Sequence, residues 1–142
     1  MESSFVGLIL DTSVLITAER LRLTPAQAVS SVQAITGEIA IGLSALSVAE
    51  LGHGIYRASS EERRNRRRAF VEEVKATLPI YSMTVQTAEI VARVDGEQAA
   101  KGQKLPLSDL IIGACALELG YAIGTHNFRD FERIPGLTVI RL

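Results

Sequence analysis

The chain has 142 residues, the length of one domain that can bury a substantial hydrophobic core. Its 16 acidic and 15 basic residues leave a net charge of −1, so any contact with nucleic acid must use a local basic patch. A single cysteine excludes an internal disulfide framework and a cysteine-based zinc site. No apolar run reaches the roughly 18 residues of a membrane span, and no basic segment precedes the N-terminal apolar run. We therefore expect a cytoplasmic protein.

Short apolar runs alternate with longer helical patterns along the first half of the chain. Residues 5–10 form a continuous apolar run, which is typical of a parallel strand buried on both faces. The elements expected next are, in order, helices at 14–21 and 25–35, a strand at 39–43, a helix reaching Ala58 and a helix reaching Thr77. The helix N-caps expected are Thr24, then Ser44 or Ser47, then one of the serines at 59–60.

The same alternation continues through the second half. The elements expected are, in order, a strand at 79–83, a helix capped by Thr84 that reaches Ala100, a loop at 101–106, a helix at 109–119 capped by Ser108, a strand at 121–125, a polar turn at 126–133 and a strand at 137–141. The helix at 109–119 is apolar on all sides, so we expect it to be buried. Strands that alternate with helices predict an α/β domain with a parallel sheet.

Polar residues stand where several of these elements begin or end. Asp11 ends the first strand, Glu50 lies in the early turns of a helix, and Asp109 opens the apolar helix. Asn127 and Asp130 follow the fourth strand. The carboxyl ends of parallel strands converge on one crevice, so we expect these side chains to meet there. Carboxylates held together stay ionised only if a cation neutralises them, and Mg²⁺ or Mn²⁺ prefer such oxygen ligands.

The alternative for each residue alone is a structural role. Asp11 has the position of a helix cap, and Asp109 can complement a helix dipole. Glu50 and Asp109, however, have mainly apolar neighbours, with no Lys or Arg beside either. Burying an unpaired carboxylate is costly. A shared metal ion would remove that cost for both.

Four segments in a fixed order then resemble one family. They are residues 8–16, 46–51, 105–114 and 125–131, and the tail at 134–137 matches as well. Each segment alone is weakly specific, but the set resembles PIN-domain proteins, and most closely the VapC toxins of type II toxin–antitoxin pairs. The resemblance extends over essentially the whole chain.

The resemblance implies a fold, an activity and partners. The fold is a PIN-like three-layer α/β arrangement, with a central parallel sheet of four to five strands flanked by helices, forming one domain over residues 1–142. The activity is that of a Mg²⁺-dependent endoribonuclease, with Mn²⁺ as a substitute, that hydrolyses RNA phosphodiesters with a metal-activated water and leaves 5′-phosphate and 3′-hydroxyl ends. The partners are a cognate VapB-like antitoxin, an RNA substrate and a second copy in a homodimer.

The resemblance also implies roles for individual residues. Asp11, Glu50 and Asp109 match the invariant acidic positions of the family, with Asp11 and Asp109 as direct metal ligands and Glu50 as a ligand through water or a general base. Asn127 occupies the fourth position, where many members carry Asp, and Asp130 follows three residues later. Either residue can complete the site, and the choice bears on whether one or two metal ions bind. Two neighbours of the first aspartate, Thr12 and Ser13, match the motif as residues that orient it or contact a phosphate.

An arginine-rich segment is the second functional signal. Residues 57–68 hold six Arg and two Glu, a local charge of +4 on a nearly neutral chain. Arg63, Arg64 and Arg67 are candidates for binding RNA phosphates. The alternatives are a solvated helix face and an interface with a second copy or an antitoxin.

Competing activities fit the sequence less well. Glu50 and His53 have the Glu-x-x-His spacing of di-iron bundles, but the second such pair that this site needs is missing. An aspartyl-phosphate phosphatase needs a second Asp where Ser13 stands. A phosphorelay receiver needs an Asp after the third strand and a Lys after the fifth, and neither is present at those places. The alternative that stays open is a PIN-like fold that binds RNA or a partner without cleaving, because Asn127 departs from the family pattern. The identity of the RNA cannot be read from the sequence.

Overall fold

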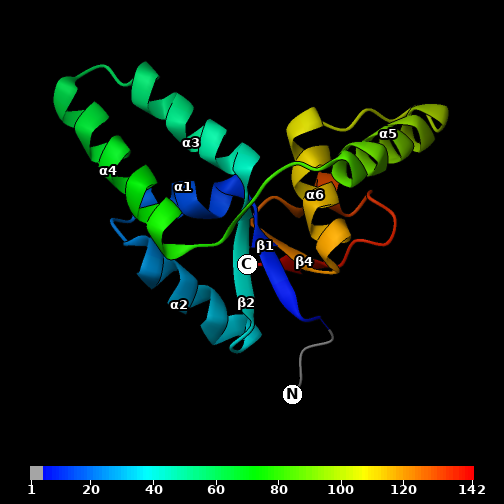
Figure 1. Ribbon diagram of the computed structural model, residues 1–142, viewed down its shortest axis with the longest axis horizontal. Helices are drawn as coiled ribbons and strands as arrows, with labels where there is room; N and C mark the ends of the chain where they lie inside the picture. The colour runs from blue at the N-terminus through cyan, green and yellow to red at the C-terminus, as the bar shows by residue number, and fades with distance from the viewer. Residues whose placement is uncertain (1–4) are drawn as a thin grey trace.

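The computed structural model describes residues 5–142, and within them five parallel strands form one sheet (Figure 1). The strands are β1 (Gly7–Leu10), β2 (Ala40–Ser44), β3 (Ile80–Tyr81), β4 (Ala122–Thr125) and β5 (Val139–Arg141). Their order across the sheet is β3-β2-β1-β4-β5, and every neighbouring pair is parallel. The predicted α/β class with a flanked parallel sheet is confirmed.

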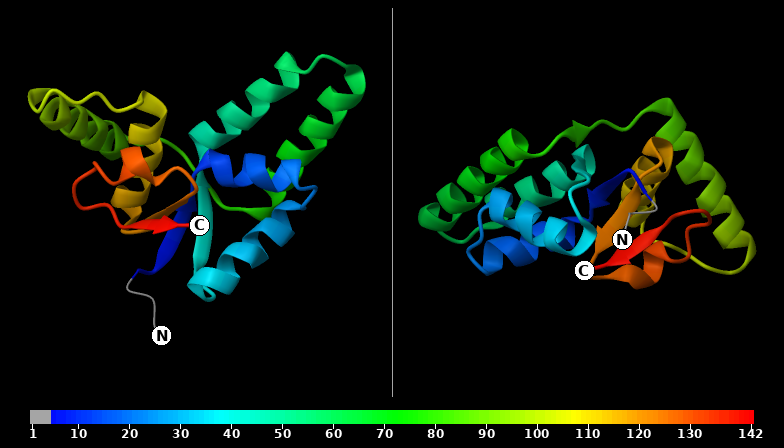
Figure 2. Two further views of the ribbon diagram at one scale, coloured as in Figure 1. Left: turned by 180° about the vertical axis from the view of Figure 1, so that it is seen from behind. Right: turned by 90° about the horizontal axis from the view of Figure 1, so that it is seen from below.

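Helices cover both faces of the sheet. They are α1 (Thr12–Arg20), α2 (Pro25–Thr36), α3 (Ala45–Arg57), α4 (Glu61–Thr77), α5 (Val85–Ala100), α6 (Leu107–Leu119) and the short α7 (Phe128–Phe131). The first four lie on one side, with α3 and α4 forming a long hairpin, while α5 and α6 lie on the other side, as Figure 2 shows from two further directions. Within residues 5–142, no helix combines the length and the apolar character needed to cross a membrane.

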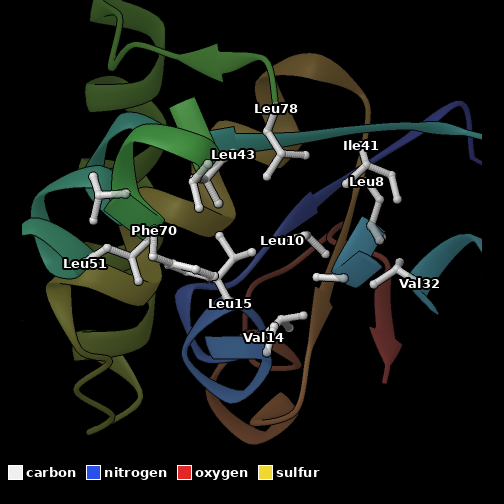
Figure 3. Close-up of a cluster of buried hydrophobic side chains, with 14 of the residues drawn as sticks. Leu8, Leu10, Val14, Leu15, Val32, Ile41, Leu43, Leu51, Phe70 and Leu78 are labelled. Carbon is white, nitrogen blue, oxygen red and sulfur yellow. The ribbon is translucent and has the colours of Figure 1, made fainter. Parts of the chain in front are cut away.

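Side chains along β1 point alternately to the two faces of the sheet, and they divide the core into two clusters. Leu8 and Leu10 point to the side of α1–α4, and Ile9 points to the side of α5 and α6. All three are fully buried. Figure 3 shows the larger cluster, in which Leu15 of α1 and Phe70 of α4 pack among side chains of β1, β2 and α3. Because β1 is buried on both faces, its continuous apolar run correctly predicted a central strand.

Most helix starts follow the predicted caps. Thr24 and Thr84 each make a capping box, and the Ser60 hydroxyl accepts from the backbone N–H of Arg63. Of the two serines proposed for α3, Ser44 is the cap.

The start of α6 was predicted wrongly. The cap is Pro106, whose carbonyl accepts from the N–H of Leu110 at 3.1 Å, so α6 begins at Leu107 and Ser108 lies inside its first turn. Proline lacks the N–H that a helix start leaves unpaired anyway, which makes it tolerable at this boundary. The expected burial of α6 is confirmed at Leu110 and from Ile112 to Ala116, and Cys115 is a buried free thiol.

The strand order creates a switch point beside β1. From β1 the chain moves outward through β2 to β3, then returns to add β4 and β5 on the opposite side of β1. In open α/β sheets, ligand sites form outside the carboxyl ends of the strands at such a reversal. Here the reversal lies between β1 and β4, so the residues that follow Leu10 and Gly124 border the expected crevice.

The packing around α1 leads to a stability prediction. Leu15 is fully buried, whereas Leu21 at the end of α1 is 65% exposed. Leu15→Ala should lower the free energy of unfolding by about 2–5 kcal/mol, because it leaves a cavity in the larger cluster. Leu21→Ala should change it by no more than about 0.5 kcal/mol. Urea denaturation of both variants tests this, and equal losses would contradict the assigned core.

Candidate functional site

Asp11 lies at the switch point, between the ends of β1 and β4. Its backbone N–H donates to the carbonyl of Gly124 at 2.9 Å. Its Oδ2 accepts from the hydroxyl of Ser13 at 2.7 Å and from that of Thr125 at 2.9 Å. Within residues 5–142, no donor contacts Oδ1, and no buried side-chain oxygen lacks a partner, so Oδ1 is open to solvent. The carboxylate is thus held by one oxygen and presents the other to a ligand.

A second set of hydrogen bonds joins α1 to α3. The Thr12 hydroxyl donates to Glu50 Oε1 at 2.6 Å and lies 2.7 Å from the buried hydroxyl of Ser47. These contacts hold the Glu50 carboxylate against Thr12, the residue next to Asp11 in the chain. Ser47, considered from the sequence as a helix cap, instead fixes this junction.

Asp109 lies in the first turn of α6 and faces these acidic groups. Its pKa is raised to about 6, chiefly because burial disfavours the charged form. Repulsion from three other carboxylates adds to the shift, in the order Asp11, Asp130, Glu50, and a hydrogen bond to Asp130 contributes last. The structure therefore brings together the acidic residues that the sequence singled out.

One argument made from the sequence is wrong. Glu50 has apolar neighbours in the sequence, but its side chain is exposed. The buried residues of α3 are Ser47, Leu51 and Ile55, which recur every fourth position, and Glu50 lies beside that stripe. Asp109, by contrast, is half-buried, as expected. The cost of desolvation thus falls on Asp109 and not on Glu50.

Asn127 and Asp130 occupy different positions around α7. Asn127 precedes the helix, is exposed, and donates its backbone N–H to the Thr125 hydroxyl at 2.8 Å. Asp130 is half-buried, interacts directly with Asp109 and lies 3.8 Å from Arg133 Nη1. The carboxylate of Asp130 therefore belongs to the acidic group, whereas the Asn127 side chain makes no hydrogen bond within residues 5–142.

Thr125 is the residue that sequence reasoning missed. It ends β4, is completely buried, and its hydroxyl both donates to Asp11 and accepts from Asn127. The only signal was its place at the end of an apolar run. That signal has no meaning until β4 is known to pair with β1.

The candidate RNA-binding arginines lie apart from the acidic group. Arg63 and Arg64 are exposed in the first turns of α4. Arg67 is half-buried. Its guanidinium makes a bidentate ion pair with Glu19, with Nη2 2.5 Å from Oε1 and Nε 2.8 Å from Oε2, and Nη1 donates to the Leu51 carbonyl at 3.2 Å. Arg67 therefore holds α4 against α1 and α3 and has little capacity left for a phosphate.

The acidic group has the chemistry of a hard divalent cation site. Within residues 5–142, no three carboxylate, histidine or cysteine side chains form a complete metal-ligand set. Mg²⁺ does not require one, because it keeps several waters and commonly binds through one or two carboxylates and substrate phosphates. The free Oδ1 of Asp11 and the carboxylate of Asp109 fit such a site. A cation there would relieve the repulsion that raises the pKa of Asp109.

Comparison with known proteins identifies what the chain resembles. The family model described as PIN domain matches residues 8–137. Ribonuclease VapC1 of Rickettsia felis is 31% identical over 135 residues, covering 95% of this chain and 96% of that protein. The tRNA(fMet)-specific endonuclease VapC of Salmonella typhimurium is 30% identical over 97 residues, 68% of this chain and 71% of the relative. The crystal structure of VapBC2 from Rickettsia felis, bound to a promoter DNA fragment, matches with a TM-score of 0.80 at 19% identity, covering 95% of this chain and 98% of that one.

The raised pKa of Asp109 predicts a specific pH dependence of stability. In the metal-free protein the folded state holds this proton up to about pH 6, whereas the unfolded chain releases it near pH 4. The stabilisation from that proton is complete below about pH 4 and is lost as the pH rises through 6, a change of at most about 3 kcal/mol.

Asp109→Asn should abolish this dependence. Its stability relative to the natural chain should rise between about pH 4 and pH 7, because the variant carries no charge to desolvate. Urea denaturation of both proteins in EDTA across this range measures the difference. A difference that does not change with pH would contradict the assigned cause.

Proposed function

Because the chain belongs to the PIN-domain family, and within it to the VapC ribonucleases, we propose that it is an endoribonuclease and the toxin of a type II toxin–antitoxin pair. The observation that carries this proposal is the gathering of Asp11, Glu50, Asp109 and Asp130 at the switch point of the sheet. Carboxylates held together against their mutual repulsion destabilise the fold, so a ligand-binding role accounts for them better than a structural one.

We propose Mg²⁺ as the cofactor, with Mn²⁺ as a substitute. Nucleases of this family are metal-dependent in general. Asp11 and Asp109 would be the direct ligands, and Glu50 would act through water. A bound divalent ion would neutralise the phosphate oxygens of RNA and acidify a water molecule for attack on the phosphorus.

The residues around the site would prepare it for that chemistry. Ser13 and Thr125 fix one oxygen of Asp11 and leave the other free. Thr12 fixes Glu50, whose exposed carboxylate is available as a general base toward water. Asp109 is largely ionised above pH 6, so the full negative charge would be present at neutral pH. The products would carry 5′-phosphate and 3′-hydroxyl ends.

We propose partners from the relatives and a location from the substrate. The VapBC2 structure from Rickettsia felis contains a toxin with its antitoxin, and we propose that this chain likewise pairs with a VapB-like antitoxin and forms a homodimer. Its RNA substrate would place its action in the cytoplasm. Arg63 and Arg64 remain candidates for RNA contact, together with Thr12 and Ser13, whereas Arg67 supports them through its ion pair with Glu19.

Asp11→Asn is the direct test of the catalytic proposal. RNA cleavage in Mg²⁺ should fall by at least about 100-fold, because the charge that would hold the cation is lost. The amide can still accept from Ser13 and Thr125, so the melting temperature in EDTA should not fall. Labelled RNA digested by both proteins, with the ends sequenced, gives the measurement. Equal cleavage by the variant and the natural chain would contradict the catalytic proposal. RNA binding without cleavage by the natural chain would favour an RNA-binding protein that is not a nuclease.

A pair of variants decides which residue completes the site. Asp130→Asn should lower cleavage at least about tenfold and lower the pKa of Asp109, because it removes a neighbouring negative charge. Asn127→Ala should have the smaller effect, since its side chain makes no hydrogen bond within residues 5–142. Cleavage rates and the pH dependence of unfolding measure both. The reverse order of effects would assign the position to Asn127.

A further inference from the structure

A cleft of about 520 Å³ opens between the end of α1, the end of α3 and the first half of α4. Six arginines line it: Arg20, Arg22, Arg57, Arg63, Arg66 and Arg67. Among residues 5–142, Glu19 is the only acidic residue in the lining. We call this feature the arginine cleft. Such a concentration of positive charge on a chain of net charge −1 requires an explanation beyond solubility.

Most of this charge is not neutralised within the protein. Both carboxylate oxygens of Glu19 pair with Arg67, and Arg66 pairs with Glu62 at 3.0 Å on the surface. The other four arginines make no ion pair or side-chain hydrogen bond within residues 5–142. They are Arg20, Arg22, Arg57 and Arg63. Four unpaired guanidinium groups around one cleft repel one another, and an anionic ligand would remove that repulsion.

The floor of the cleft is built around Arg67. Gly54 of α3 lies beneath its guanidinium, and a Cβ at that position would overlap Arg67 Nη1. The missing side chain lets Arg67 lie across α3 and reach both Glu19 and the carbonyl of Leu51. Arg67 is therefore a positioning residue that fixes the three helices, and the four unpaired arginines stand around it.

Arg22 adds an independent observation. It is the only non-glycine residue within 5–142 with positive φ, at 59°. Its N–H donates to Glu19 and that of Leu23 donates to Ala18, so Arg22 occupies the position after α1 where glycine is strongly preferred. An arginine there strains the backbone, and its side chain lines the cleft. Strain of this kind is typical of functional sites.

The cleft and the acidic group lie along the same faces of α1 and α3, toward opposite ends of the two helices. On α3, Glu50, Gly54 and Arg57 are spaced by three or four residues and so share one face. On α1, Thr12, which binds Glu50, shares a face with Ile16 and Glu19 of the cleft. Seven residues of helix separate Glu50 from Arg57, or about 10 Å.

We propose that the arginine cleft binds the phosphate backbone of single-stranded RNA, a few nucleotides away from the bond that is cut. This deepens the proposed nuclease function and rests on it. The acidic group repels RNA, so binding needs positive charge nearby on the surface, and the cleft supplies it toward the other ends of α1 and α3. Of the residues that the structure describes, Ile16 and Ala58 are the only ones with apolar side chains in the lining. A lining so poor in apolar groups favours a polyanion over a peptide that needs apolar anchors.

The test compares two triple variants with the same loss of charge. Arg20→Gln, Arg57→Gln and Arg63→Gln together remove three unpaired arginines from the cleft. Arg68→Gln, Lys75→Gln and Arg93→Gln together remove three charges from residues that do not line the cleft.

The measurement is the binding of a fluorescent oligo(U) of roughly 20 nucleotides over a range of salt concentrations. It is made in EDTA, so that no cleavage occurs. The cleft variant should bind at least about tenfold more weakly, with the slope of log K against log[salt] reduced by up to about 2. The control variant should retain the affinity of the natural chain.

Arg22→Gly separates binding from stability. Glycine relieves the positive φ, so the melting temperature should rise by about 2–4 °C while RNA binding weakens. A purely structural arginine would change the melting temperature alone, and that result would count against the proposal.

The remaining outcomes are also decisive. Equal losses in the two triple variants would mean a diffuse charge effect and would overturn the cleft as a site. Cleft variants that lose binding to poly-L-glutamate but keep binding to RNA would assign the cleft to an acidic peptide instead. The nuclease function is read separately, from cleavage in Mg²⁺ by the natural chain and by Asp11→Asn. A natural chain that binds RNA through the cleft but cuts none would count against the function and leave the cleft standing.

Discussion

The hydrogen bond between Thr125 and Asp11 joins residues 114 positions apart, and the site depends on the strand pairing that makes it possible. β1 and β4 become neighbours because the chain builds one half of the sheet outward from β1 and then returns to its other side. That reversal places two strand ends side by side with no helix between them. The Asp11 carboxylate fills the gap, tied by its backbone to Gly124 and by one oxygen to Thr125.

The grouped carboxylates of the site lower the stability of the fold that holds them. α6 is buried around most of its circumference, so Asp109 in its first turn is carried into a poorly solvated position near three other carboxylates. The raised pKa of Asp109 measures that conflict, because the folded protein resists the charge that cation binding requires. Proteins commonly place such unfavourable groups where a ligand will compensate them. The secondary structure around Asp109 is regular, so the conflict arises from tertiary packing alone.

Local sequence signals predicted the elements well and the contacts between them less well. The apolar run before Asp11 and the threonine caps at 24 and 84 act within a few residues, so they could be read directly. The burial of Glu50 was misjudged because its neighbours along the chain are apolar, whereas exposure depends on which stripe of α3 meets α1. Thr125 and Ser47 were overlooked or misassigned for the same reason, since hydroxyl groups gain a role only from partners that the tertiary fold brings to them. The ion pair of Arg67 with Glu19 likewise spans 48 residues and has no local signature.

The near-zero net charge is the sum of two separate clusters, the acidic group and the arginines of the cleft. Carboxylates gather where α1 and α3 begin, and unpaired arginines gather where the same two helices end. If solubility were the only requirement, acidic and basic residues interspersed over the surface would be more favourable, because each arginine could then pair with a carboxylate. Arg67 and Glu19 show that such pairing is available, and they use it to hold the helices together. Four of the arginines left unpaired within residues 5–142 face the open cleft. This is the distribution expected if a long anion extends from the cleft to the acidic group and meets negative charge only where a cation can screen it.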